Sequence, residues 1–226
     1  MKERAIIFSA PMVRAILEGR KTQTRRVLKS QPGCVHDGEP YWAVGGYRVW
    51  SYRGITDVLR MGTVNPQRCP FGTVGERLWV RETWGPCRGV GDSHPIAIAD
   101  ATYACFPDGS QKFKSGEYCH HGSPVTGSWP TGYKWRPSIH MPRWASRITL
   151  EIAGVKVERL NEITGSDCAN EGICGQIGSP RSYGVVTESF AREQFQRIWE
   201  SINGPGSWDA NPWVWVIEFR LTEPRQ

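Results

Sequence analysis

The sequence predicts an α+β protein, namely a small mixed β-barrel with short flanking helices and a long irregular insertion. Roughly five to seven short segments are rich in β-forming residues and bounded by turn residues. These segments do not alternate regularly with long helices, which argues against a doubly wound parallel sheet. The 25 Gly, 16 Pro and 11 Trp among 226 residues indicate a loop-rich fold rather than a helical bundle. A chain of this length can bury a core without disulfides, so we expect a single domain over residues 1–226.

The first elements follow from local patterns near the N-terminus. Residues 4–8 form an apolar run that predicts a strand. Ser9 followed by Pro11 is typical of a helix start, and Gly19 is typical of a helix end. A short helix is therefore predicted between Ser9 and Gly19.

The middle of the chain is richer in turns than in regular elements. Strands are predicted at 47–53 and, after the Gly75-Glu76 turn, at 77–83. Residues 85–140 are predicted to form an irregular, lid-like insertion, with a hairpin near 101–106.

The C-terminal part has the clearest periodic patterns. Two consecutive strands, 147–152 and 155–159, are predicted around Gly154, followed by a short capped helix from Thr164 to Gly172. A stripe of apolar residues predicts a helix over 188–202 that ends at Gly204-Pro205. A dense run of β-forming residues predicts a closing strand over 213–221.

The net charge of +6 is concentrated at one end of the chain. Residues 1–30 hold eight Lys or Arg and two Glu, and 8 − 2 = 6 equals the charge of the whole protein. Such a patch suits an anion or a nucleic acid as partner, and it equally suits a solvated basic face.

Other sequence features limit which compartment and which cofactors we expect for the protein. The N-terminal apolar run is too short for a signal peptide, and no segment reaches the roughly 20 apolar residues of a membrane span. The seven Cys include no C-x-x-C pair, so we expect reduced thiols, a cytoplasmic protein and no membrane partner. We also expect no metal site, because the Cys and His residues of the insertion lack zinc-ligand spacing; these residues are Cys87, His94, Cys105, Cys119, His120 and His121.

The segment from Gly19 to Arg26 has the densest potential chemistry. It contains four cations among eight residues, and their repulsion is expected to lower the pKa of Lys21. A neutral lysine can take the proton of a hydroxyl, and Thr24 lies three residues away. A phosphate-binding or merely solvated basic loop explains the same run.

The pattern Gly19-x-Lys21-x-x-Thr24-x-Arg26, after a strand and a short helix, resembles the signature of ASCH domains, which are small β-barrels related to PUA domains. The resemblance continues in order along the chain through Gly75–Leu78, Ile163–Glu171, Phe190–Ile202 and Val216–Phe219. Within this superfamily the run Gly-Arg-Lys-Thr-x-Thr-x-Arg is most similar to the compact bacterial N(4)-acetylcytidine amidohydrolases. Those enzymes are about half as long, so residues 30–74 and 85–145 are expected to be insertions, as in longer bacterial and phage ASCH proteins.

The resemblance implies removal of an acyl group from the exocyclic amine of a cytidine-like nucleoside, without a metal or an organic cofactor. It places the catalytic Lys at Lys21, the Thr at Thr24 and the Glu at Glu171, with Glu82 as the fallback for the acid. The residues expected to contact the substrate are Arg20, Arg26, Glu82, Trp84, Trp144 and Arg147.

Two other functions stay open at this stage. The insertions contain the tryptophans Trp42, Trp50, Trp129, Trp135 and Trp144, and Trp84 directly precedes the second insertion. Aromatic residues interleaved with arginines over 134–144 suit base stacking and phosphate contact, or else they pack the core of the insertion. The chain is therefore an N-acyl nucleoside hydrolase or a non-catalytic module that binds RNA or modified DNA. A ribonuclease is the third reading.

Overall fold

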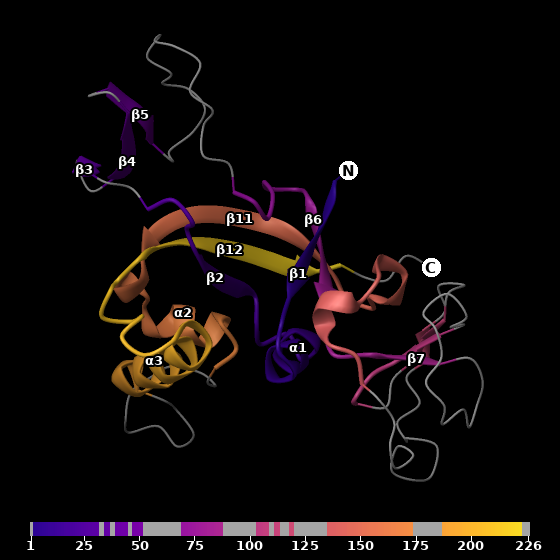
Figure 1. Cartoon of the computed structure of the whole chain (residues 1–226). Helices are drawn as coiled ribbons and strands as arrows, with labels where there is room; N and C mark the ends of the chain where they lie inside the picture. The colour runs from indigo at the N-terminus through magenta and orange to yellow at the C-terminus, as the bar shows by residue number, and fades with distance from the viewer. Residues whose placement is uncertain are drawn as a thin grey trace. The chain divides into compact units, whose positions relative to one another are not determined.

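The computed structural model describes residues 2–31, 34–36, 39–44, 47–51, 69–87, 103–108, 111–113, 118–119, 135–173 and 187–222. Figure 1 shows the arrangement of the elements along the chain. They are β1 (Glu3–Ile7), α1 (Ala10–Leu17), β2 (Gln23–Val27), β3 (Cys34–His36), β4 (Glu39–Val44), β5 (Tyr47–Ser51), β6 (Arg77–Arg81), β7 (Gly85–Cys87), β8 (Tyr103–Cys105), β9 (Gln111–Phe113), β10 (Tyr118–Cys119), the 3-10 helices η2 (Ser138–His140) and η3 (Arg143–Ala145), β11 (Thr149–Arg159), the 3-10 helix η4 (Leu160–Glu162), α2 (Gly165–Asn170), α3 (Glu188–Asn203) and β12 (Trp213–Leu221).

The chain divides into two compact units. Unit 1 is Met1–Leu17, Glu76–Glu151 and Arg220–Gln226, and unit 2 is Glu18–Gly75 and Ile152–Phe219. The strands β11 and β12 contribute residues to both units.

The main sheet has five strands in the order β1-β6-β11-β12-β2. The strand β1 is parallel to β6, whereas β6 with β11 and β12 with β2 are antiparallel, so the sheet is mixed and the protein is α+β as predicted. The closed barrel is not formed among the described strands, because β1 and β2 end the order as edges. Just before β2, the N–H of Thr22 donates to the oxygen of Asn170 at 2.8 Å, so the end of α2 binds the backbone at the start of this edge strand.

Unit 1 contains the sheet β10-β9-β8-β7 in addition to β1, β6 and the start of β11. The predicted hairpin near 101–106 is instead β8 paired with β9, and part of the insertion is thus regular. A small core beside it consists of Trp84, Ala104, Phe106, Met141 and Ala145, with Trp144 packed against it.

The prediction that all thiols are reduced is wrong in this structure, because Cys105 at the end of β8 is disulfide-bonded. Sequence alone could not reveal this bond, because the spacing of the seven cysteines does not fix which of them pair.

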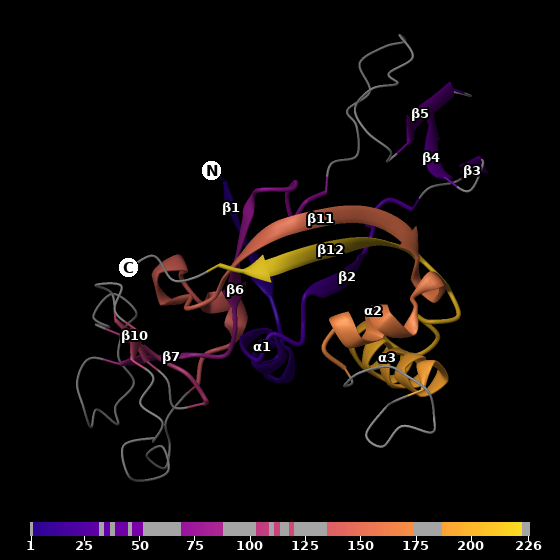
Figure 2. The same ribbon diagram turned by 180° about the vertical axis from the view of Figure 1, so that it is seen from behind.

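Unit 2 buries its apolar residues between the sheet and two helices. In Figures 1 and 2, α2 and α3 lie on the same side of the β12–β2 pair. Thr164 caps α2 by accepting from the amide of Asp167, and the Asp167 carboxylate accepts from the amide of Thr164. The core under these helices is formed by Leu160, Ile163, Cys168, Ala191, Phe195, Trp199, Trp208, Val214 and Val216. The three-stranded sheet β3-β4-β5 belongs to the same unit and includes most of the predicted 47–53 strand.

Two predictions about strands are corrected. The strands expected on either side of Gly154 are one continuous strand, β11. A Cβ at position 154 would lie 2.7 Å from Glu218 Oε2, a contact that the flexible Glu218 side chain could relieve by shifting. The segment at 19–26, treated as a loop, contains β2, whose residues Gln23–Val27 pair with the strongly β-forming β12.

No helix in the described part of the chain is long and apolar enough to cross a membrane.

Candidate active site

Lys21 lies at the junction between the α1–β2 turn and β2. Gly19 has a φ of 73°, which a residue without Cβ adopts without strain, and the chain then enters an isolated bridge between Lys21 and Glu171. Thr22 continues this junction, because its oxygen accepts from the amide of Phe219 at 2.8 Å. The backbone therefore holds the end of α2 beside the start of β2.

The Lys21 ammonium is enclosed and fully hydrogen-bonded. Its Nζ donates to Gln23 O at 2.8 Å, to Glu171 O at 2.9 Å and to Glu171 Oε2 at 2.7 Å. The side chain of Lys21 is 0% exposed and that of Glu171 is 4% exposed. A buried ion pair of this kind joins two residues that the sequence resemblance had selected 150 positions apart.

Burial is the main reason why the pKa of Lys21 lies below its usual value. Glu171 opposes this shift through its charge and its hydrogen bond, whereas the charges of Arg26 and Arg25 add to it. The predicted direction is therefore confirmed, although burial rather than repulsion between cations is the larger cause.

Arg25 extends the pair into a network of buried charges. Its Nη1 donates to Glu171 Oε1 at 3.3 Å, its Nε donates to Glu158 Oε1 at 3.0 Å, and its Nη2 also bonds Glu158. The same Nη2 lies 3.2 Å from Asp167 Oδ2 in α2. Gln23 Nε2 donates to Asp167 Oδ1 at 3.2 Å, so two residues of β2, Gln23 and Arg25, contact the Asp167 carboxylate of α2.

The electrostatics of Asp167 reflect this double role as helix cap and ion-pair partner. Burial raises its pKa, but the hydrogen bonds from Thr164 and the charge of Arg25 outweigh burial, and the resulting pKa is below the usual value. Asp167 is therefore ionised and binds both the start of α2 and Arg25.

Thr24 lies in the middle of β2 and is 3% exposed. Side chains alternate along a strand, so Thr24 and Arg26 share one face of β2, whereas Gln23 and Arg25 share the other. Burial lowers the pKa of Arg26 from its usual value, and Glu171 opposes this shift. Among the described residues, no hydrogen bond is observed between the Thr24 hydroxyl and Lys21 or Glu171, so the structure does not bring Thr24 into this contact, and its catalytic use stays a prediction.

Arg20 reaches the same end of α2 from outside. Its Nη1 donates to Gly172 O at 3.0 Å, and its Nε donates to Glu18 at 2.8 Å. Arg20 is exposed, so of the predicted substrate-contacting residues in unit 2 it is the one at the surface.

The other predicted substrate-contacting residues lie in unit 1. Arg147 forms a bidentate salt bridge with Glu82, in which both N–O distances are 2.8 Å. Its Nη1 also donates to Asp108 at 2.6 Å. Burial raises the pKa of Glu82, and Arg147 opposes this shift. Glu171 and not Glu82 is the acid that contacts Lys21.

The two predicted tryptophans contribute to the core of unit 1. Trp84 is 0% exposed, and its ring meets that of Trp144 edge to face at a centroid distance of 6.0 Å. This placement corresponds to the packing alternative rather than to base stacking. The side chains of Trp42 and Trp50, and Trp129 as a whole, lie outside the described residues.

The sequence analysis missed Arg25, Glu158 and Asp167 as members of this site. The sequence did contain a signal for Arg25, namely the alternation of side chains in a strand. If residues 23–27 form a strand, Arg25 lies on the same face as Gln23 and on the opposite face from Thr24. Asp167 was recognised only as part of a helix start, and nothing in the sequence linked Glu158 to Arg25.

The metal-site residues considered in the insertion cannot be placed in full. His94, His120 and His121 lie outside the described residues, as do the side chains of Cys87 and Cys119. Within the residues that the structure describes, no group of three or more His, Cys, Asp or Glu side chains could hold a metal ion.

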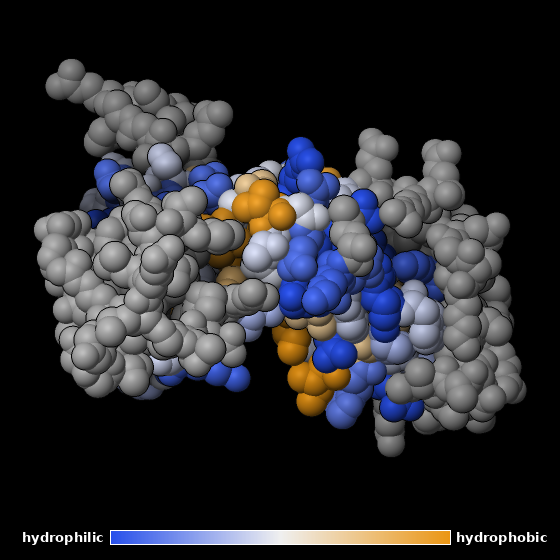
Figure 3. All heavy atoms as spheres, turned by 90° about the horizontal axis from the view of Figure 1, so that it is seen from above, coloured by the Kyte–Doolittle hydropathy of each residue, from blue (hydrophilic) through white to orange (hydrophobic). Residues whose placement is uncertain are grey.

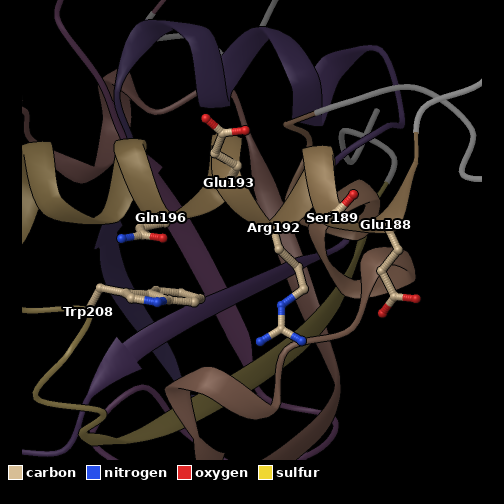
Figure 4. Close-up of a pocket in the computed structure, with 6 residues that line it drawn as sticks. All are labelled: Glu188, Ser189, Arg192, Glu193, Gln196 and Trp208. Atoms are coloured by element: carbon tan, nitrogen blue, oxygen red, sulfur yellow. The ribbon is translucent and has the colours of Figure 1, made fainter.

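A shallow pocket of about 570 Å³ lies elsewhere on unit 2. Figure 4 shows Gln196 beside the ring of Trp208, with Arg192 nearer the start of α3. The pocket is lined by Glu188, Ser189, Arg192, Glu193, Gln196 and Trp208. None of these is a predicted site residue, and the lining contains no lysine that could act as a base.

Comparisons with models of protein families, with curated proteins and with solved structures found no match to this chain.

Proposed function

We propose that the chain is an ASCH-type, PUA-like protein that hydrolyses the exocyclic N-acyl group of a cytidine-like nucleoside. The observation that carries this proposal is the 2.7 Å contact between Lys21 Nζ and Glu171 Oε2. The sequence resemblance selected these two residues for catalysis from opposite halves of the chain. Their burial in contact with each other supports a shared role.

In the proposed reaction Lys21, in its neutral form, takes the proton of the Thr24 hydroxyl. Thr24 Oγ, or a water that it positions, attacks the acyl carbon of the amide. The C–N bond then breaks, and the amino group leaves with a proton that Lys21 and Glu171 return to it. Water releases the acid if Thr24 has been acylated. The burial that lowers the pKa of Lys21 favours the neutral amine that the first step needs.

Incubation of the purified protein with N(4)-acetylcytidine tests this function directly. We expect cytidine and acetate in equal amounts by chromatography, and the same turnover in the presence of a metal chelator. N-acylated adenosine and guanosine serve as controls for the choice of base. The proposal fails if none of the N-acylated nucleosides loses its acyl group.

A second candidate function, binding of single-stranded nucleic acid without catalysis, is favoured by a cluster of arginines in unit 1. The guanidinium of Arg81 lies 4.7 Å from the centroid of the Trp79 ring, and that of Arg143 lies 5.9 Å from it. Alternation along β6 puts Arg77 on the same face of the strand as Trp79 and Arg81. Figure 3 shows one face of the molecule, seen from above, on which hydrophilic (blue) and hydrophobic (orange) residues lie side by side. Trp79 is buried beneath these side chains, so the arginines suit phosphates rather than leave the ring open to a base.

Salt dependence separates the two functions. Binding of an unstructured RNA through these arginines should weaken steeply between 50 and 200 mM salt, by roughly an order of magnitude or more for several phosphate contacts. Turnover of a neutral nucleoside should hardly change over this range. Arg81→Ala should weaken binding, whereas Arg197→Ala, at an exposed position of α3, is the matched control. Shortening of the RNA during the assay would instead indicate the ribonuclease.

A further inference from the structure

Arg25 is a charged residue of the Lys21 site to which the sequence resemblance gives no role. It occupies one of the variable positions of the pattern Gly19-x-Lys21-x-x-Thr24-x-Arg26. Nevertheless, its side chain is 0% exposed and contacts three carboxylates from two further elements. A buried arginine with this many partners needs an explanation, because burial of each charge is costly.

The two oxygens of the Glu171 carboxylate are divided between two cations. Oε2 accepts from Lys21 at 2.7 Å, and Oε1 accepts from Arg25 at 3.3 Å. Rotation of the carboxylate would break one of these contacts, so the two cations together fix its orientation. The guanidinium is planar and rigid, which suits it to hold one oxygen while the compact ammonium binds the other.

Arg25 is itself held in place by acids on both sides. Glu158 of β11 accepts from its Nε at 3.0 Å, and Asp167 of α2 lies 3.2 Å from its Nη2. Lys156 binds the other oxygen of Glu158 at 3.0 Å. The ion-paired cations Lys21, Arg25 and Lys156 thus match the ion-paired carboxylates Glu158, Asp167 and Glu171 in number. The charge of Arg26 adds to this site, because it acts on both Lys21 and Glu171.

We propose that Arg25 is the positioning residue of this site, which holds Oε1 of Glu171 and thereby directs Oε2 at the Lys21 amine. Arg25 acts through Glu171 and does not touch the reacting atoms. This inference rests on the proposed function for its effect on turnover, but the geometry of the Lys21–Glu171 pair can be tested without any substrate.

Arg25 also affects the protonation of Lys21. The groups that act on the Lys21 amine are Glu171 at the end of α2, which favours the charged form, and Arg26 and Arg25 on β2, which disfavour it. Arg25 partly neutralises the charge of Glu171. Its removal should therefore strengthen the attraction between Glu171 and the charged form of the Lys21 amine. The pKa of Lys21 should therefore rise when Arg25 is replaced by a neutral residue.

The experiment compares Arg25→Gln and Arg25→Lys with the unchanged protein. The first readout is the pH titration of the Lys21 ε-carbon by NMR in protein with ¹³C-labelled lysine. The second is the pH profile of kcat/KM on N(4)-acetylcytidine. Arg159→Lys is the matched control, because Arg159 stacks on Trp213 at 4.5 Å in the same unit without an observed contact to Glu171.

We expect Arg25→Gln to move the Lys21 titration to higher pH and to lower kcat by about 10²-fold near neutral pH, the cost of a misplaced catalytic group. Arg25→Lys keeps the positive charge but lacks the planar guanidinium. Its Lys21 titration and its kcat should lie between those of Arg25→Gln and those of the unchanged protein. The basic limb of the pH profile should shift together with the Lys21 titration. Arg159→Lys should leave both readouts unchanged.

An unchanged Lys21 titration in folded Arg25→Gln overturns the proposal. If Arg25→Gln does not fold, Arg25→Lys decides, and a titration and turnover equal to those of the unchanged protein overturn it. If no acylated nucleoside is turned over by any form, the proposed function fails, while the NMR titration still decides the role of Arg25.

Discussion

Replacement of Lys21 by methionine is expected to lower kcat/KM for N(4)-acetylcytidine by about 10²–10⁴-fold, the usual contribution of a positioned general base. Methionine fills a similar volume and removes the only amine in contact with Glu171 among the described residues. Thr24→Val, which keeps the shape of the side chain and removes the hydroxyl, should cause a loss of the same size.

The pH dependence gives this prediction a second signature. Lys21 acts as a base only when neutral, so turnover should rise as pH increases through its pKa, which burial lowers. The same shift affects stability. Because the unfolded chain binds this proton more tightly than the folded protein, the free energy of unfolding should rise as pH passes from the folded pKa toward the usual 10.5.

Two variants control for indirect effects. Thr24→Ser keeps a hydroxyl and should retain much of the turnover, and Lys29→Met, at an exposed position after β2, should retain all of it. Circular dichroism checks that each protein is folded. The Lys–Thr mechanism is wrong if folded Lys21→Met and Thr24→Val both keep the activity of the unchanged protein.

Replacement of Arg147 by methionine is expected to cost about 3–5 kcal/mol of unfolding free energy at pH 8, because it leaves the buried Glu82 carboxylate without its cation. Arg147 and Glu82 form two N–O contacts of 2.8 Å, and their side chains are 2% and 5% exposed. The variant also loses the packing of the guanidinium over Phe106 at 4.1 Å.

This cost should shrink in acid. Burial raises the folded pKa of Glu82 above its ordinary 4.5, so the folded protein binds this proton more tightly than the unfolded chain. The stability linked to that proton is present at low pH and is lost as pH rises through the folded pKa. Without Arg147 the pKa should be higher still, so the deficit of the variant should be smaller at pH 5 than at pH 8.

Urea denaturation at pH 5, 6.5 and 8 measures this difference. Arg197→Met removes an exposed pair with Glu193 and should cost less than about 0.5 kcal/mol at every pH. A cost of Arg147→Met that is equally large at all three pH values would show that lost packing, and not the charge of Glu82, dominates.

The sequence predicted the elements whose signals are local. The helices predicted between Ser9 and Gly19 and over 188–202, and the capped helix after Thr164, were found because caps, glycine ends and apolar stripes are properties of neighbouring residues. The strand β2 was missed because Gln-Thr-Arg-Arg-Val has little strand propensity of its own, and β12 imposes the conformation by pairing with it.

The same distinction applies to the candidate site. Lys21 and Glu171 were named from a motif and an order along the chain, and the structure brings them into contact. Arg25 could not be assigned, because its role depends on Glu158 and Asp167, which approach it only after β11 and α2 have packed. The open sheet was mistaken for a barrel because strand number alone does not reveal which edges pair.

Hydrogen exchange at the Thr22 amide can report how often the buried Lys21 amine becomes accessible. The N–H of Thr22 bonds Asn170 at the end of α2, whereas its oxygen bonds the amide of Phe219 on β12. Any opening that lifts α2 away from β2 must expose the Thr22 amide to deuterium while the Phe219 amide stays protected. Where closing is slow compared with chemical exchange, the exchange rate at Thr22 equals the rate of this opening, and a substrate admitted by this route cannot be turned over faster.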